Sequence, residues 1–441
     1  MTSPNNAIEI FKAAVAAVHP EKLVPAHLFI QNDSLHIFDQ EILLQKLPDI
    51  YVIGAGKASA AMAKAVENIL GDLITGGLII AKNDHSLPLN KIVCIEAAHP
   101  VPDEQGFAAT AATVQLLKQV KENDIIICLI SGGASSLWID APPGASLTDV
   151  QQTFELLLKS GASIDEVNTI RKHLSSIKGG QLLRQAPKAR WFSFIISDVP
   201  GDDLSVIASG PTVPDHSTFE DVNALLQQYH LSSQLPLSIR QHFENADKGL
   251  TAETPKSGDP IFKQVINTII GSNAIALEAA ATKAKEFGYH IAPINTCLTG
   301  DAATVGRELI LMAKKYSGIK PACFLSGGET TVTVTGKGKG GRNQHLVLSA
   351  LLEMESMADQ KFSNTITFLS AGTDGSDGPT DAAGAIVDGE TLSMVYEKQL
   401  DAQHYFENND AYHLFEQTGS LIITGATQTN VMDLVVVIVD N

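Results

Sequence analysis

The chain has 441 residues, of which 44% are hydrophobic and 18% are charged, and its formal net charge is −18. This length suits two or three domains with sizeable cores, and the composition is that of a globular protein rather than a disordered one. The negative charge argues against non-specific binding to nucleic acid or to an anionic membrane. A phosphate site would have to be local, built from a few cations and backbone N–H groups.

The four cysteines are scattered, and no CxxC pair occurs. Cys94, Cys128 and Cys323 fall within apolar, strand-like runs, as expected for buried thiols in a reducing compartment. The first residues lack a basic start followed by an apolar block, and no apolar run is as long as a membrane span. We therefore expect a soluble, cytoplasmic protein without a membrane partner.

A first glycine turn follows the apolar run at residues 50–53, which predicts a buried strand. The turn, GAGKAS at residues 54–59, leads into a predicted helix at residues 60–70. It resembles a dinucleotide fingerprint, but Ser59 stands where the third glycine is expected, and Tyr51 stands where a P-loop would begin with glycine. Both a packing turn and a nucleotide-binding turn fit this pattern.

A second glycine turn ends another predicted strand. Apolar runs at residues 77–81, 91–96 and 124–130 alternate with a helical pattern at residues 108–120, which predicts parallel βαβ units. The last of these runs continues into SGGASS at residues 131–136. Ligands of such folds bind beyond the carboxyl ends of the strands, and both glycine turns belong to that edge.

A basic helix is predicted further along. Ser163 and Glu166 predict a capping box in front of the segment VNTIRKHLSSIKGG. Four basic residues give this segment a face that fits a solvated surface or a ligand contact, and we interpret it as solvated: Arg171, Lys172, His173 and Lys178.

Three carboxylates in six residues, Asp198, Asp202 and Asp203, follow the predicted strand at residues 191–196. They could bind Mg²⁺ through oxygen, or they could cap the following turn.

The domain boundary is expected where the apolar pattern is lost. Residues 214–261 are polar and contain prolines, without periodic apolar positions. We therefore predict an N-terminal domain at residues 1–245 and a C-terminal domain at residues 262–441, with the boundary near 245–262.

The predicted C-terminal domain contains the richest motif, LSGGETTVTVTGKGKGGRNQH at residues 325–345. An apolar strand ends in SGGET, the alternation at Thr331–Thr335 predicts a further strand, and Arg342 opens an amphipathic helix whose N-terminus could receive an anion. Lys337 and Lys339 could solubilise a mobile loop or close over a nucleotide. A later strand runs into SAGTDGSDG, which contains Asp374.

These features favour phosphoryl transfer, which needs fixed N–H donors, permanent cations, Mg²⁺ and a group that orients the attacking hydroxyl. The candidate catalytic residues are Lys57, Arg342, Asp198, Glu329 and Asp374. The candidate metal ligands are Asp198, Asp202 and Asp374. The candidate nucleotide-binding residues are Gly54, Gly56, Ser131, Gly132, Gly133, Ser135, Gly327, Gly328, Gly340 and Gly341. No GxSxG elbow and no zinc-binding spacing occurs in the sequence.

Taken together, these motifs resemble the class II glycerate 2-kinase family, also described as the MOFRL family. The similar segments cover nearly the whole chain, in the order VIGAGKAS, LISGGASSL, VNTIRKHLSSIKGGQL, ISDVPGDDLSVIASGPTVPD, the motif at residues 325–345, SAGTDGSDGPTDAAGA and TNVMDL. The resemblance implies two α/β domains, the first Rossmann-like with a mostly parallel sheet, and an active site in the cleft between them.

The resemblance also implies an enzyme that uses ATP and Mg²⁺ to convert D-glycerate into 2-phosphoglycerate and ADP. The family's functional lysine and arginine match Lys57 and Arg342. We assign Lys57 to the transferred phosphate, and Arg342 either to the glycerate carboxylate or to the γ-phosphate. The sequence is compatible with a homo-oligomer.

Two other functions fit parts of the sequence. The GAGKAS turn could serve an NAD(P)H-dependent hydroxypyruvate reductase, although no acidic residue follows at the expected spacing and Asp72 is the nearest. A non-catalytic nucleotide-sensing module would also use glycine turns, but it would not release ADP.

Overall fold

The computed structural model describes residues 2–357 and 365–441. Contacts divide the chain into two compact units, which are described separately below. We call residues 20–197 and 202–270 the parallel-sheet unit, and residues 1–19, 198–201 and 271–441 the mixed-sheet unit.

The parallel-sheet unit is organised around a six-stranded sheet with the order β6-β5-β4-β7-β8-β9. Neighbouring strands from β6 to β8 pair in parallel. Every residue of β4 and β7 is buried, as expected for central strands covered on both faces. Because β4 and β7 are parallel neighbours, their carboxyl ends lie next to each other, with Ala55 opposite Ile130. The strands are β4 (Ile50–Ala55), β5 (Ile74–Lys82), β6 (Ile92–Ala97), β7 (Ile125–Ile130), β8 (Arg190–Ile196) and β9 (Val265–Gly271).

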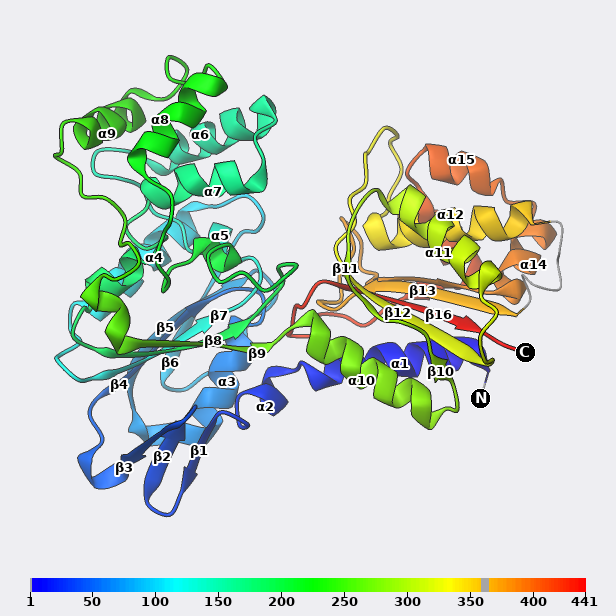
Figure 1. The fold of residues 1–441 in the computed structure, drawn as a ribbon, viewed down its shortest axis with the longest axis horizontal. Helices are drawn as coiled ribbons and strands as arrows, with labels where there is room; N and C mark the ends of the chain where they lie inside the picture. Colours follow the sequence, from blue (N-terminus) through cyan, green and yellow to red (C-terminus); the bar gives the residue numbers. More distant parts are fainter. Residues whose placement is uncertain (1, 358–364) are drawn as a thin grey trace. The chain divides into compact units, whose positions relative to one another are not determined.

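Helices pack against this sheet and form a separate helical layer in the same unit (Figure 1). Next to the sheet lie α3 (Ser59–Leu70) and α4 (Glu104–Leu117). The helical layer has its own apolar core and consists of α6 (Leu147–Ser160), α7 (Ile164–His173), α8 (Phe219–Gln228) and α9 (Leu237–Asp247). The capping box predicted from Ser163 and Glu166 is confirmed at the start of α7.

Shorter elements complete the parallel-sheet unit. A three-stranded antiparallel sheet consists of β1 (Leu28–Gln31), β2 (Ser34–Ile37) and β3 (Gln40–Leu43). The short helices are α2 (Pro20–Leu23), η1 (Leu44–Lys46), η2 (Gly71–Leu73), α5 (Ala134–Leu137), η3 (Gln181–Gln185), η4 (Ile207–Ser209) and η5 (Pro260–Gln264).

The mixed-sheet unit has a sheet with the order β10-β12-β16-β13-β14-β15, and β11 also pairs with β12. The final strand β16 runs antiparallel between β12 and β13 and is buried along its whole length. The strands are β10 (His290–Ile291), β11 (Asn295–Leu298), β12 (Ala322–Gly328), β13 (Ile366–Gly372), β14 (Gly384–Val387), β15 (Leu421–Ile422) and β16 (Asp433–Val439).

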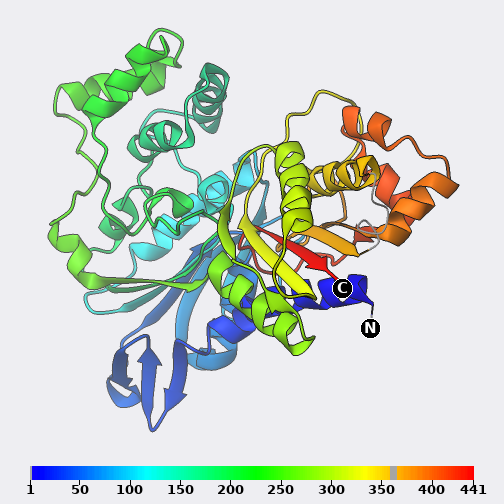
Figure 2. The same ribbon diagram turned by 45° about the vertical axis from the view of Figure 1, so that its right-hand side comes forward.

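Both faces of this sheet are covered by helices (Figures 1 and 2). One face packs against α1 (Ser3–Ala17) and α10 (Asn273–Glu286), and these two helices also contact each other. The other face carries α11 (Ala302–Lys315), α12 (Arg342–Ser356), α14 (Gly389–Glu397), α15 (Ala402–Glu407) and α16 (Ala411–Thr418). Alternate residues of β16 therefore enter two apolar cores, which explains its unbroken run of valine, leucine and isoleucine.

Three expectations differ from this architecture. The contacts separate the units at residues 270 and 271, not at 245–262, because β9 extends the first sheet. They also place residues 1–19 in the mixed-sheet unit, because α1 packs on α10. The strand predicted at Thr331–Thr335 is wrong: only an isolated bridge joins Thr331 to Asp301.

None of the helices in the described part of the chain combines the length and the apolar character needed to cross a bilayer.

Candidate active site

The two glycine turns predicted in the parallel-sheet unit are hydrogen-bonded to each other. The Lys57 N–H donates to the Gly132 carbonyl oxygen over 2.8 Å, and the Ala58 N–H donates to Ser131 Oγ over 3.0 Å. Gly56 has φ +132°, and a Cβ at this position would lie 2.1 Å from Ser131 Oγ. Only glycine fits this junction, because the backbone of one turn approaches the other so closely.

Lys57 lies beside the second turn. Gly133 adopts the left-handed region with φ +84°, where a Cβ would lie 2.9 Å from the His99 ring and 3.6 Å from Lys57 Cγ. Lys57, His99 and Gly133 therefore meet at the carboxyl edge of β4 and β7. Gly54 has a different role, since a Cβ there would lie 2.4 Å from the Leu129 carbonyl oxygen of the neighbouring strand.

The segment behind the second turn is held by a buried lysine. Lys178 Nζ donates to the carbonyl oxygens of Ser135, over 2.9 Å, and Trp138, over 2.5 Å. Burial lowers the pKa of Lys178 to about 8, while Asp140 acts in the opposite direction. The Ser135 hydroxyl lies 3.2 Å from that of Ser209. These contacts fix the conformation of the predicted SGGASS motif.

The interpretation of the basic segment around α7 as a solvated face is wrong. Lys172 and His173 are buried: Lys172 pairs with Asp215 over 3.2 Å, and His173 Nε2 lies 2.8 Å from Glu253 Oε1. Arg171 differs from both, because within residues 2–357 and 365–441 its guanidinium has no hydrogen bond or ion pair. It lies over the Phe154 ring, 4.9 Å from the centroid, and burial lowers its pKa.

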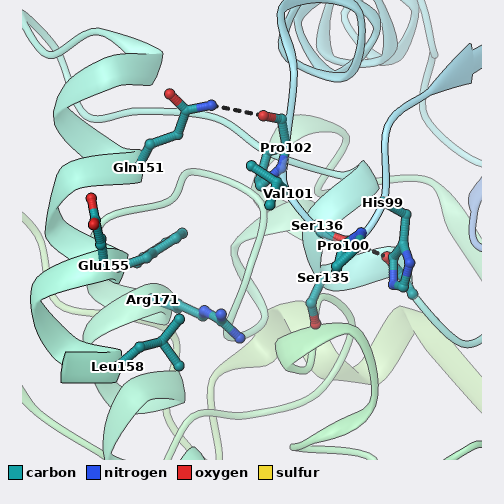
Figure 3. Close-up of a pocket in the computed structure, with 12 residues that line it drawn as sticks. His99, Pro100, Val101, Pro102, Ser135, Ser136, Gln151, Glu155, Leu158 and Arg171 are labelled. Carbon is teal, nitrogen blue, oxygen red and sulfur yellow. Dashed lines mark hydrogen bonds between the residues drawn. The ribbon is translucent and has the colours of Figure 1, made fainter. Parts of the chain in front are cut away.

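Arg171 lines a cavity of about 590 Å³ that reaches the second glycine turn (Figure 3). Its lining comes from three places: the segment before α4, the start of α5, and the facing sides of α6 and α7. The residues are His99, Pro100, Val101, Pro102, Gly133, Ser135, Ser136, Gln151, Phe154, Glu155, Leu158 and Arg171.

The mixed-sheet unit brings Arg342 and Glu329 together with a residue that we did not identify from the sequence. Arg342 Nε and Nη2 donate to the two carboxylate oxygens of Asp433 over 2.6 and 3.0 Å, and Nη1 lies 2.6 Å from Glu329 Oε1. Burial alone would lower the pKa of the Arg342 guanidinium, but Asp433 and Glu329 outweigh it and the pKa is raised. These contacts use three of the five N–H groups of a guanidinium.

The N-terminus of α12 holds an anion from the protein itself. The buried Asp377 carboxylate accepts hydrogen bonds from the backbone N–H groups of Asn343, over 3.0 Å, and Gln344, over 2.8 Å. Burial raises the pKa of Asp377 to about 6, against the effect of these N–H donors. For these two N–H groups, the prediction of a free site for a ligand anion is wrong.

Three of the four predicted binding glycines of this unit are packed closely against other parts of the chain, whereas a Cβ on the fourth, Gly340, would lie at an ordinary 3.5 Å from its nearest neighbours. A Cβ on Gly341 would lie 2.3 Å from the Asp377 carboxylate, and a Cβ on Gly378 would lie 2.4 Å from the Gly340 carbonyl oxygen. Gly327 is packed against Asn273 and Gly328 against the backbone of Leu298. Packing inside the protein thus requires glycine at the three closely packed positions, independently of any ligand.

The glycine and lysine loop before α12 is tied down along its backbone. The N–H groups of Lys337 and Lys339 donate to the side chains of Asn408 and Asp410, over 3.0 and 2.8 Å. Lys339 Nζ lies 3.8 Å from the centroid of the Tyr412 ring. These contacts fix the backbone of the loop and explain why the alternating residues before it do not join a sheet.

The predicted metal ligands fall in different units. Asp198 accepts a hydrogen bond from Asn430 Nδ2 over 3.2 Å in the mixed-sheet unit, whereas Asp202 belongs to the parallel-sheet unit. Asp374 and Asp433 are close neighbours, since a Cβ on Gly372 would lie 3.2 and 3.4 Å from their oxygens. No group of three or more histidine, cysteine or acidic side chains in the described ranges is arranged to hold a metal ion. The carboxylates nevertheless suit Mg²⁺, which takes one or two of them and completes its shell with water and phosphate.

These features define an α/β protein with a lysine at the junction of two glycine turns in one unit and an arginine set among carboxylates in the other. Its sequence matches two family models, the domain of unknown function DUF4147 over residues 6–244 and the MOFRL family over residues 322–433. The chain belongs to the MOFRL family of glycerate 2-kinases, and it is an enzyme of that family.

Relatives of known name support this assignment. The chain is 39% identical to the D-glycerate 2-kinase of Thermotoga maritima, covering 98% of this chain and 97% of the relative. A crystal structure of glycerate kinase from the same organism matches with a TM-score of 0.84 and 38% identity over 99% of both chains. A protein of Agrobacterium vitis named putative hydroxypyruvate reductase is 39% identical, covering 87% of this chain and 85% of the relative.

Proposed function

We propose that this protein transfers the γ-phosphoryl group of ATP to the 2-hydroxyl of D-glycerate, forming 2-phosphoglycerate and ADP. The observation that carries the proposal is the position of Lys57 at the junction of two hydrogen-bonded glycine turns. The similarity to D-glycerate 2-kinase along nearly the whole chain supports the choice of substrate.

The parallel-sheet unit supplies the phosphate-binding side of this reaction. Its strand order is like that of doubly wound sheets, in which ligands bind beyond the carboxyl ends of the strands at the point where the strand order reverses. In this sheet that point lies between β4 and β7. Lys57 lies at this point and neutralises charge on the transferred phosphoryl group. Gly56 and Gly133 let the backbone of the two turns approach the phosphates.

Arg342 binds the second charged group. Beyond its contacts with Asp433 and Glu329, it has two further N–H groups that suit a carboxylate or phosphate oxygen. We assign these groups to the glycerate carboxylate or to the γ-phosphate, while the two acidic residues hold the guanidinium plane in place. Asp198 or Glu329 accepts the proton of the attacking hydroxyl.

Asp198, Asp202 and Asp374 are the residues that would hold Mg²⁺ together with the nucleotide phosphates. When bound, Mg²⁺ neutralises charge on the β- and γ-phosphates and orients them. Asp374 is buried and its Oδ1 accepts the Ser376 N–H over 3.0 Å, so its orientation is set before any ligand binds.

Coupled measurement of ADP release tests the proposal, with D-glycerate, L-glycerate, hydroxypyruvate and tartronate supplied in parallel. We expect turnover with D-glycerate, and we expect Lys57→Ala and Arg342→Ala each to lower kcat by about a thousandfold or more. Circular dichroism should show that both variants are folded. Near wild-type turnover in a folded variant would remove that residue from the mechanism.

The relative named putative hydroxypyruvate reductase makes reduction of hydroxypyruvate the second candidate. Ser59 occupies the place of the third fingerprint glycine, and its Oγ lies 2.7 Å from the Gly56 carbonyl oxygen, where it supports the turn. Oxidation of NADH by hydroxypyruvate, followed by absorbance, would favour the reductase. Binding of ATP without ADP release in any of these assays would favour a nucleotide-sensing module.

A further inference from the structure

The cavity beside the second glycine turn has features that the proposed reaction does not yet use. Its walls are largely apolar and come from two sides: the segment Pro100–Pro102 and the side chains of Phe154 and Leu158. Gln151 Nε2 donates to the Pro102 carbonyl oxygen over 2.7 Å, which fixes one wall to the other (Figure 3). The cavity is therefore a preformed site rather than a gap between loosely packed helices.

Arg171 points into this cavity, which is also lined by the polar side chains of His99, Ser135, Ser136, Gln151 and Glu155 (Figure 3). Within the described residues its guanidinium has no carboxylate partner, although the next residue, Lys172, pairs with Asp215. A partly desolvated guanidinium is unfavourable unless a ligand offers it a π-face or a negative charge. One face of Arg171 is already covered by the Phe154 ring. The other face of the Arg171 guanidinium is suited to stacking on a planar group of a ligand.

The size of the cavity distinguishes between the two proposed substrates. Cavities of roughly 300–1,000 Å³ hold ligands much larger than a three-carbon acid. At about 590 Å³, this cavity is far larger than glycerate requires, and it suits a base with its ribose. One end is formed by Gly133, Ser135 and Ser136, and Gly133 is packed beside Lys57. A ligand that fills the cavity would thus direct its phosphates toward Lys57.

We infer that this cavity is the nucleoside subsite of the phosphoryl donor. The purine base lies between Arg171 and the apolar segment Pro100–Pro102, next to Phe154 and Leu158, and the phosphates extend along the second glycine turn. This inference rests on the proposed function for its choice of a nucleoside triphosphate as ligand. It adds the residues that recognise the nucleoside, a group of side chains far from Arg342 in sequence.

Equilibrium binding of ADP and of inorganic tripolyphosphate to the full chain, in buffer with Mg²⁺, tests the subsite without requiring turnover. Arg171→Met keeps a long side chain against Phe154 but removes the charged planar group. We expect about tenfold weaker ADP binding, because the base loses a stacking and cation–π partner. Tripolyphosphate lacks a nucleoside, so its binding should change less than about twofold. In turnover assays, KM for ATP should rise and KM for D-glycerate should stay constant.

Arg184→Met is the matched control. This exposed arginine lies in the same unit and donates to the Glu253 carbonyl oxygen over 2.9 Å, outside the cavity. Leu158→Trp provides a second, independent variant, because Leu158 is 66% exposed at the cavity wall and a larger side chain there blocks the space without disturbing a core. We expect Arg184→Met to bind ADP normally and Leu158→Trp to bind it about tenfold more weakly.

Three results would overturn the subsite: unchanged ADP binding in both Arg171→Met and Leu158→Trp, equal weakening of ADP and tripolyphosphate, or a rise in KM for D-glycerate alone. The last result would instead make the cavity the acid-binding site. The proposed function can fail separately: a protein that binds ADP with the expected pattern but never phosphorylates glycerate retains the subsite and loses the kinase.

Discussion

Asp433→Asn should lower turnover by displacing Arg342, without removing any group that contacts substrate. Asp433 is buried, and its two oxygens accept hydrogen bonds from Arg342 Nε and Nη2 over 2.6 and 3.0 Å. Asparagine keeps the shape but offers one oxygen and one NH₂ group. The NH₂ group would face a guanidinium N–H, so one charge-assisted bond is lost and two donors oppose each other.

The size of the effect follows from these contacts. A hydrogen bond to a charged group contributes about 1.5–3 kcal/mol. The Arg342 side chain is 32% exposed, so water screens part of the lost charge, and we expect about 2 kcal/mol less stability in the mixed-sheet unit. A displacement of about 1 Å in a positioning group can cost about a hundredfold in rate. We therefore expect kcat to fall about 10–100-fold, less than in Arg342→Ala.

Steady-state ADP release and urea unfolding measure the two effects on the same samples. Asp388→Ala is the control, since Asp388 caps α14 in the same unit by accepting the Thr391 N–H over 2.8 Å. Loss of this cap should cost about 1 kcal/mol of stability and leave kcat unchanged. The reasoning is refuted if Asp433→Asn keeps more than half of wild-type kcat, or if the control loses as much activity.

Other consequences can be measured in simpler assays. Gly56→Ala should destabilise the protein by about 3 kcal/mol or more in thermal or urea unfolding, because its Cβ would lie 2.1 Å from Ser131 Oγ at a positive φ; a stable, active variant would contradict the close contact. Burial raises the pKa of Asp377 to about 6 in the folded protein, so its protonation favours folding below about pH 4 and this contribution is lost as pH rises through 6. Asp377→Asn should therefore gain stability relative to the wild type between pH 4 and 7, and parallel pH profiles would disprove this. Iodoacetamide at pH 8 should modify the exposed Cys297 first and leave Cys128 unmodified in the folded protein, since burial raises the pKa of the Cys128 thiol; mass spectrometry of the peptides would reveal the opposite order.

The features predicted best from the sequence are those that a short local pattern of residues determines. The apolar runs that end in GAGKAS and SGGASS are β4 and β7 with their turns, and the contact between Lys57 and Gly132 follows from their pairing as parallel neighbours. The capping box at Ser163 likewise needs only residues three positions apart. Arg342 was identified because it opens a helix after a glycine-rich segment.

Partners distant in sequence could not be predicted in the same way. Asp433 lies 91 residues beyond Arg342, and Asp377 lies 34 residues beyond Asn343, so nothing local marks them as partners. The basic residues of α7 were misinterpreted for the same reason. Lys172 is buried and forms an ion pair with Asp215, and Asp215 comes from a distant segment without periodic apolar residues. At Thr331–Thr335 the alternation is real, but the following loop is held by Asn408 and Asp410 and not by a neighbouring strand.

The place of α1 and β16 in one unit has a consequence for synthesis on the ribosome. Roughly 250 residues separate α1 from its partner α10, and the central strand β16 begins roughly 150 residues after α10. At about 5–20 residues per second, α1 must wait roughly 10–50 s for that partner. The parallel-sheet unit is nearly continuous in sequence and can fold during this interval. Removing residues 433–441 would delete β16 and leave β12 and β13 without the strand that joins them.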